Sequence, residues 1–340
     1  MRASTFTYRD RENLTLFAHE WLPDHPPRAV LQIAHGMQEY AGRYERAAVA
    51  FSKAGISVVA ADLRGHGRSL IGPDKFGHLG PGGWKGVLGD IKQLTEIIQK
   101  RHRRLPLFLL GHSWGSFMVQ GYIQRWGRTL KGAILSGTNG ANPVLRVGQL
   151  LAKGVVAVRG GDKTAKLLEK VSMGAYNKYF APKKTGLEWL SRDQNEVDKF
   201  VRDPLCGIPF PNSFFLETAS LLMDVWTGEN ERRIPPSLPI YMFSGTDDPV
   251  GMRGKGVRAL AARYTRVGVR DLTVKLYDGG RHEMINELNR DQVVGDIVQW
   301  MDARLALPRT DADFTPAQGI EAELLSPRPS APAERPSAQL

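Results

Sequence analysis

Cysteine is almost absent from this sequence: Cys206 is the only one among 340 residues. A single cysteine excludes a disulfide within the chain and leaves no cysteine cluster for a structural zinc site. This usage is typical of proteins in a reducing compartment, although exported bacterial proteins can lack cysteine as well. We therefore predict a cytoplasmic location and no metal site.

Long hydrophobic runs are also absent. No stretch approaches the roughly 20 apolar residues that a membrane-spanning helix requires. The first 13 residues contain no apolar segment of the signal-peptide type. Zinc fingers and short, dense basic blocks are missing too, so we expect no nucleic-acid partner.

Acidic residues are outnumbered by basic ones. The chain has 46 lysines and arginines against 35 aspartates and glutamates, a formal net charge of +11. The excess lies before residue 308, because residues 308–340 hold three arginines against five acidic residues. Such a surface can favour peripheral contact with an anionic membrane, or it can simply be solvated. The sequence leaves both interpretations open.

Short apolar runs alternate with amphipathic helical patterns along most of the chain. The helical spacing is clearest at 84–101 and 291–305, and buried strands are predicted at 29–34, 56–61, 107–110, 132–136, 239–244 and 272–277. This alternation predicts an α/β fold with a mostly parallel central sheet flanked by helices.

Two stretches fall outside the alternation. Residues 137–236 contain helical patterns but no convincing core strand, and residues 308–340 are rich in proline and poor in large apolar residues. We therefore predict a core formed by 1–136 and 237–307. The stretch 137–236 is predicted to be a helical insertion, and 308–340 a disordered tail.

A Gly-x-Ser-x-Gly pattern follows one predicted strand directly, as Gly111-His112-Ser113-Trp114-Gly115. The next residues, 116–126, predict a helix. A strand, a sharp turn and a helix form the context in which this pattern holds a nucleophilic serine. Side chains at the two glycine positions would collide with the neighbouring strand and helix. Ser113 is therefore the candidate nucleophile.

A serine hydroxyl needs a base, and the base needs a carboxylate that orients it. In this type of site the chain order is serine, acid, histidine. The strand predicted at 272–277 leads to His282, the candidate base. The strand at 239–244 leads to Asp247 and Asp248, and the pattern does not choose between these adjacent residues. Either aspartate could instead cap a turn.

Acyl transfer also needs hydrogen-bond donors for the developing oxyanion. The backbone N–H of Trp114, the residue after the nucleophile, is one candidate. The second is the backbone N–H of Met37, because His35-Gly36-Met37 follows a predicted strand and Gly36 allows the chain to turn inward. Neither role requires a metal or an organic cofactor.

Five short motifs occur in order along the chain. They are HGM at 35–37, DLRGHGRS at 62–69, GHSWG at 111–115, GTDDPV at 245–250 and RHE at 281–283. Together they resemble the monoacylglycerol lipase and lysophospholipase branch of the α/β-hydrolases. LSRD at 190–193 and DPLCG at 203–207 are similar to the cap of bacterial members. The resemblance covers about residues 3–305.

The resemblance implies a set of roles for this chain. In the family the acid stands three residues after the strand-end glycine, which implies Asp248 as the acid. It also implies Met37 and Trp114 as oxyanion donors, structural roles for His66 and His112, and a cap, or lid, formed by 137–236. The implied substrate is a small-molecule acyl ester or lipid, with no cofactor.

The predicted function is therefore a serine ester hydrolase that cleaves acyl esters of glycerol-type lipids, monoacylglycerol or lysophospholipid, through an acyl-enzyme. A short-chain carboxylesterase, a thioesterase and an aminopeptidase on the same scaffold remain alternatives, because a fold alone does not choose the substrate. A non-catalytic ligand-binding module is disfavoured because serine, acid and histidine are all present. The enzyme is predicted to be cytoplasmic, with peripheral membrane contact left open.

Overall fold

Eight strands form one sheet in the order β1-β2-β4-β3-β5-β6-β7-β8 in a computed structural model that describes residues 1–306. Only β2 runs against the other strands. The predicted mostly parallel sheet flanked by helices is confirmed, and the predicted tail at 308–340 lies outside the described residues. The strands are β1 Arg2–Arg9, β2 Thr15–Leu22, β3 Ala29–Ala34, β4 Ile56–Ala61, β5 Leu107–His112, β6 Gly132–Ser136, β7 Ile240–Gly245 and β8 Leu272–Tyr277.

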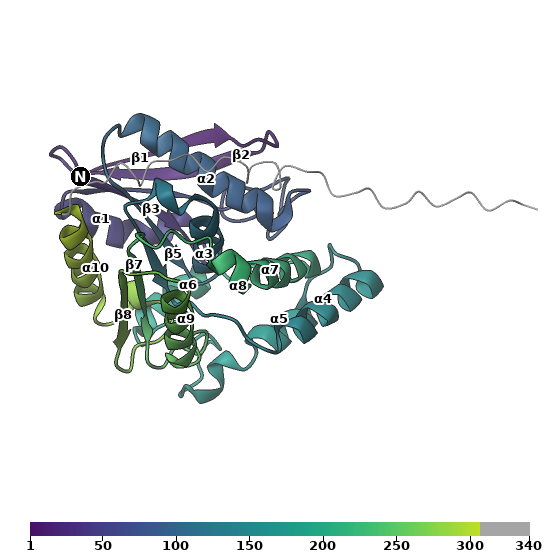
Figure 1. The fold of residues 1–340 in the computed structure, drawn as a ribbon. Helices are drawn as coiled ribbons and strands as arrows, with labels where there is room; N and C mark the ends of the chain where they lie inside the picture. The colour runs from purple at the N-terminus through teal and green to yellow at the C-terminus, as the bar shows by residue number, and fades with distance from the viewer. Residues whose placement is uncertain (307–340) are drawn as a thin grey trace, which may run out of the picture.

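Helices cover both faces of the sheet (Figure 1). Helices α2, α3 and α9 pack on one face and α1 and α10 on the other. The helices outside the stretch between β6 and β7 are η1 Ala41–Tyr44, α1 Glu45–Lys53, α2 Gly83–Arg101, α3 Trp114–Trp126, η2 Gly127–Thr129, α9 Lys255–Arg266, η4 Met284–Asn286 and α10 Arg290–Leu305.

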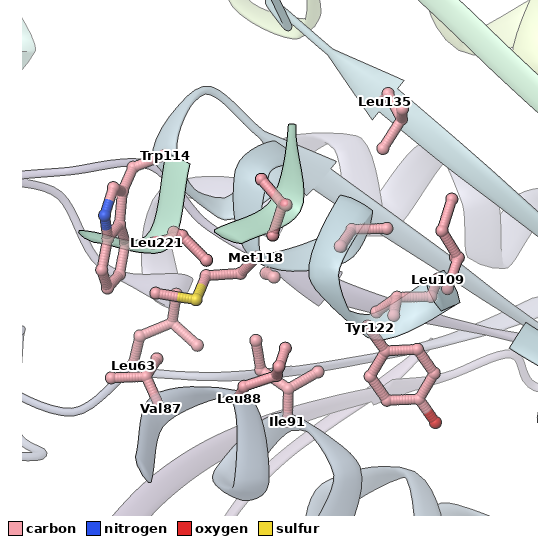
Figure 2. Packing of buried hydrophobic residues seen from close by; sticks show 14 of the residues in the cluster. Leu63, Val87, Leu88, Ile91, Leu109, Trp114, Met118, Tyr122, Leu135 and Leu221 are labelled. Carbon is pink, nitrogen blue, oxygen red and sulfur yellow. The ribbon is translucent and has the colours of Figure 1, made fainter. Parts of the chain in front are cut away.

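Alternate residues of each central strand enter different hydrophobic clusters, as the two-residue period of a strand requires. In β5, Leu109 faces the cluster under α2 and α3, whereas Phe108 and Leu110 face α1 and α10. Figure 2 shows the first cluster, where Met118 and Tyr122 of α3 lie between Leu109 and the side chains of α2. Strands β3 to β7 are buried on both faces, which explains their continuous apolar runs.

Between β6 and β7 the chain forms only helices and loops within the described residues. These helices are α4 Leu145–Arg159, α5 Lys166–Met173, η3 Tyr176–Tyr179, α6 Gln194–Arg202, α7 Asn212–Val225 and α8 Gly228–Glu231. We call the stretch 137–236 the cap. Its role as a separate lid over the site stays a prediction.

Helix α3 crosses β3 and β5 at very short range. A Cβ atom at Gly115 would lie 2.2 Å from the carbonyl oxygen of Ala34, and one at Gly111 would lie 2.4 Å from that of Gly115. Both obstacles are backbone atoms, so they cannot rotate away as a side chain can. The glycines of the Gly-x-Ser-x-Gly pattern thus allow α3 to begin directly above the sheet edge.

We expect Gly115→Ala to lower the free energy of unfolding by at least about 2 kcal/mol, because the added methyl group overpacks against backbone. Gly295→Ala in α10 is the matched control, since a Cβ there meets nothing within 4 Å. Alanine at 295 should raise the free energy of unfolding by about 0.5–1 kcal/mol. Urea denaturation of both variants measures the difference, and similar effects at the two positions would contradict the close approach.

Candidate active site

Ser113 occupies the turn between β5 and α3 in a strained backbone conformation, with φ 51° and ψ −120°. Few non-glycine residues adopt positive φ, and strain of this kind is held by its surroundings. Here the N–H of Ser113 donates to the carbonyl of Ser136 at 2.9 Å. The carbonyl of Ser113 accepts from the hydroxyl of Ser116 at 2.6 Å. These bonds fix the turn and leave the Ser113 hydroxyl half-buried at the start of α3.

His282 and Asp248 form a buried pair from two neighbouring loops. Nδ1 of His282 lies 3.0 Å from Oδ1 of Asp248, and the residues are 2% and 0% exposed. Oδ2 of Asp248 accepts from the hydroxyl of Ser244 at 2.6 Å, and Oδ1 accepts from the N–H of Val250 at 2.9 Å. Asp247 is only partly buried. Of the two adjacent aspartates, the structure brings Asp248 to the histidine.

The pair is arranged to hold opposite charges. Burial lowers the pKa of His282, but the charge and hydrogen bond of Asp248 outweigh it. The pKa of His282 is therefore raised from its ordinary value of 6.5. Burial raises the pKa of Asp248, yet the charge of His282 and the hydrogen bonds from His282 and Ser244 outweigh it. The pKa of Asp248 is therefore lowered from its ordinary value of 3.8. A carboxylate against Nδ1 leaves Nε2 as the proton-accepting nitrogen.

The candidate residues meet at one cavity of about 400 Å³, which Met37, Ser113, Trp114 and His282 all line. Among residues 1–306, neither the N–H of Met37 nor that of Trp114 has a hydrogen-bond acceptor, so both remain available to a ligand oxygen. The Ser113 hydroxyl makes no hydrogen bond to His282 in this part of the chain. Such catalytic contacts are often long without substrate and tighten when it binds.

Sequence patterns did not reveal a buried ion cluster beside the cavity. The carboxylate of Glu39 accepts from the N–H of Gly36 at 2.5 Å and from the Arg43 guanidinium at 2.6 Å. Arg43 also donates to both carboxylate oxygens of Glu283, at 2.9 and 2.8 Å. Arg43 therefore joins the turn that carries Met37 to the residue after His282. The i, i+4 spacing of Glu39 and Arg43 was the only local signal.

His112 and His66 are buried without forming part of the acid–base pair. Burial, with a contribution from nearby His282, lowers the pKa of His112 to about 4, so it is neutral near pH 7. Its Nδ1 lies 3.1 Å from the hydroxyl of Ser136. His66 packs against Trp114, with ring centroids 5.3 Å apart, and against Phe210 of the cap at 4.9 Å. Their predicted structural roles agree with these contacts.

The cap supplies much of the cavity wall. Trp189 packs against His282 with ring centroids 5.0 Å apart, and the other apolar cap residues at the cavity are Met173, Leu187, Leu190, Phe200, Phe215 and Leu222. The cap therefore contributes a largely apolar share of the lining of the cavity that Ser113 and His282 also line.

Neither a metal-binding cluster nor a membrane-spanning helix occurs in the described part of the chain. Within residues 1–306 no group of three or more histidine, cysteine, aspartate or glutamate side chains is placed to hold a metal ion. No helix in this range is long and apolar enough to cross a membrane.

Comparison with known proteins gives consistent matches. A family model described as serine aminopeptidase, S33, matches residues 25–289. A monoacylglycerol lipase of Mycolicibacterium smegmatis is 31% identical over 293 residues, covering 84% of this chain and 92% of its own length. The human monoglyceride lipase is 28% identical, covering 87% and 89%. Among solved structures, a thermostable carboxyl esterase from Bacillus coagulans, solved in complex with glycerol, is 28% identical with a TM-score of 0.83 and covers 90% of this chain and 100% of its own.

We expect Asp248→Asn to lower kcat about 10⁴-fold, because the imidazole loses the carboxylate that orients it. In the wild type kcat/KM should fall as pH drops through the raised pKa of His282, since a protonated imidazole cannot accept a proton. In Asp248→Asn the charge of Asp248 is lost, so burial dominates and lowers the pKa of His282. The fall of kcat/KM on the acid side of the pH profile, its acidic limb, should therefore move to lower pH. The pH dependence of ester hydrolysis measures both effects.

Asp247→Asn is the control for this prediction, because it makes the same chemical change one residue away. It should keep kcat within about 2-fold of wild type, as expected for a surface substitution, with the acidic limb in place. A large loss in Asp247→Asn together with a mild effect in Asp248→Asn would show that the acid has been assigned to the wrong aspartate.

Proposed function

Because this chain belongs to the serine aminopeptidase S33 family of α/β-hydrolases, we propose that it hydrolyses acyl esters of glycerol-type lipids, a monoacylglycerol or a lysophospholipid. It is a carboxylic ester hydrolase. One observation carries the proposal: a strained serine and a buried His282–Asp248 pair open onto the same apolar cavity. The small-molecule ester would place its acyl chain along the apolar wall and its carbonyl at Ser113.

In the proposed mechanism Ser113 Oγ attacks the ester carbonyl while Nε2 of His282 takes the hydroxyl proton. Asp248 holds the imidazole and stabilises its positive charge. The N–H groups of Met37 and Trp114 donate to the oxyanion of the tetrahedral intermediate. The intermediate collapses by breaking the bond to the leaving alkoxide, which receives the proton from His282. A water molecule then releases the fatty acid from Ser113 by the same two steps.

A glycerol leaving group is supported by the relatives. The two relatives compared are named for monoacylglycerol or monoglyceride hydrolysis, and the similar esterase was solved with glycerol. The cavity itself supports an acyl chain, because its lining includes the apolar side chains of Phe117, Phe215 and Leu222. Burial of such a chain provides binding energy that a short acyl group lacks.

The family description also includes aminopeptidases, whose substrates carry a positively charged α-amine. A site for that amine would need an unpaired acidic group near Ser113. Glu39 and Glu283 line the cavity, but Arg43 pairs with both. The remaining acid at the cavity, Glu169, contacts Gln38 at 3.5 Å and stands next to Lys170. This charge arrangement favours an uncharged ester over an amine-bearing peptide.

The outer cap has the features of a membrane-contact surface. Its apolar side chains are exposed on α4 and α5, among them Val147 at 68%, Leu150 at 66% and Val158 at 85%. These helices lie at the margin of the molecule, away from the sheet (Figure 1). The basic residues of the same two helices are Arg146, Lys153, Arg159, Lys166 and Lys170. Glu169 is their only acidic residue.

An exposed apolar strip bordered by basic residues is typical of a helix that lies on an anionic lipid surface. In our proposal a cytoplasmic enzyme uses this surface to rest on a membrane and take up a lipid substrate. The lining of the cavity supports this orientation, because it includes Lys170 and Met173 of α5. The surface would thus bring the lipid and the cavity together.

We expect serine-dependent hydrolysis of p-nitrophenyl esters to rise with acyl length from C2. Each additional buried methylene should contribute about 0.8 kcal/mol, or about a 4-fold gain in kcat/KM, until the cavity is full. The same assay with Ser113→Ala gives the background. Turnover of monoacylglycerol and lysophospholipid by the wild type then compares the two head groups.

The alternatives make different predictions in this assay. A maximum at C2–C4 would support a short-chain carboxylesterase instead. If no ester is turned over in a Ser113-dependent way, aminoacyl amides and then thioesters become the substrates to test, and the ester proposal fails.

We expect the wild type to bind vesicles that contain anionic lipid, and binding should weaken as salt concentration rises. Val147→Asp should reduce this binding at least about 10-fold, because an exposed apolar anchor becomes a charge that the lipid repels. Arg258→Gln on α9 is the control: like Val147→Asp it lowers the net charge by one, but it lies outside α4 and α5. Co-sedimentation with vesicles measures binding, and equal losses in the two variants would show that only net charge matters.

A further inference from the structure

The loop that carries His282 is held by the cap and not only by the sheet. The N–H of His282 donates to the carbonyl of Trp189 at 3.3 Å, and that of Glu283 donates to the carbonyl of Leu190 at 2.7 Å. The hydroxyl of Ser191 donates to the carbonyl of Asn286 at 3.0 Å. We call residues 188–193 the inner cap segment and residues 281–287 the base loop. The two run beside each other directly behind the imidazole.

A buried carboxylate joins these two segments. Glu287 is 0% exposed. Its Oε1 accepts from the backbone N–H of Arg192 at 2.9 Å and from that of Arg281 at 3.0 Å. Its Oε2 accepts from Nε of Arg192 at 2.9 Å and from the N–H of Leu288 at 2.9 Å. All four partners are donors, and the two carboxyl oxygens accept one pair of these hydrogen bonds each.

The base loop also donates hydrogen bonds to the inner cap segment. The guanidinium of Arg281, the residue before His282, donates to the carbonyls of Glu188 and Ser191 at 2.6 and 3.0 Å. It also lies over the ring of Phe180, 4.5 Å from the centroid. Arg281 is thus held at its backbone by Glu287 and at its side chain by the cap. This leaves His282 little freedom to move along the loop.

We propose that Glu287 is a positioning residue for catalysis: it fastens the base loop to the inner cap segment and thereby holds His282 against Asp248. The inference rests on the proposed function only in taking His282 as the base. Glu287 touches neither the cavity nor the acid–base pair, so it acts through Arg281 and Arg192. A displacement of the base by about 1 Å can cost about 100-fold in rate, which gives such a residue a measurable effect.

The test is Glu287→Gln, which keeps the side-chain volume but places an NH₂ group among four hydrogen-bond donors. Glu231→Gln is the matched control. Glu231 is 2% exposed and accepts two hydrogen bonds from Arg263, whose side chain is 29% exposed. In the pair under test, the side chain of Glu287 is 0% exposed and that of Arg192 is 30% exposed. The control pair joins α8 to α9 and makes no contact with the base loop.

We expect Glu287→Gln to lower kcat about 10- to 100-fold with KM changed less than about 3-fold. The pKa of His282 should also fall, because the hydrogen bond with Asp248 that raises it is weakened. An NMR pH titration, with the His282 signal assigned by its loss in His282→Gln, measures this pKa directly. Glu231→Gln should lose stability but keep the kcat and the His282 pKa of the wild type.

Equal loss of stability in the two variants, with kcat and the His282 pKa unchanged in both, would overturn the proposal. If Glu287→Gln does not fold, Arg192→Lys decides, because it keeps the three backbone donors to Glu287 and removes the Nε contact. It should lower kcat about 3- to 10-fold with a smaller downward shift of the His282 pKa, and wild-type values would overturn the inference. The NMR titration needs no substrate, so it still decides if the ester proposal fails.

Discussion

The hydrogen bond between His282 and Asp248 is the contact on which the rest of the site depends. Two buried charges are costly unless each is paired and hydrogen-bonded. Ser244 and Val250 complete the partners of Asp248, and the imidazole is enclosed between His112 and Trp189. The loops after β7 and β8 must approach closely to make this contact. A Cβ at Gly245 would lie 1.8 Å from the carbonyl oxygen of Gly280, so this position accepts only glycine.

Strand order explains why residues far apart in the sequence meet here. Parallel strands present their carboxyl ends at one edge of the sheet. Strands β3, β5, β7 and β8 all end shortly before a candidate site residue; in the same order, these residues are Met37, Ser113, Asp248 and His282. Arg43 then joins the loop after β3 to the loop after β8 through Glu39 and Glu283. The turn that carries Met37 and the loop that carries His282 are therefore tied together by an ion cluster as well as by the sheet.

Local patterns predicted the features that arise from local causes. The alternation of buried strands and amphipathic helices predicted the sheet, with the seventh strand one residue later than expected, because periodicity defines an element better than its ends. Ser113 was predictable because an elbow needs glycine on both sides. Asp247 and Asp248 could not be separated by pattern, since the side chain that points to His282 is decided by the turn and by Ser244. Glu287 gave no signal and Arg43 gave only its i, i+4 spacing from Glu39, because Arg192 and Glu283, the partners that join separate segments, lie far away in the sequence.

The contacts divide the cap into two parts with different freedom. The inner cap segment is bound to the base loop by backbone hydrogen bonds and by buried Glu287, so moving it would disturb His282. The outer helices are held far less: α4 buries only Ala152 and Val155, and α5 buries only Leu168. Elements with few buried contacts open at low free-energy cost. Displacement of α4 and α5 would therefore disturb the acid–base pair less than displacement of the inner cap segment.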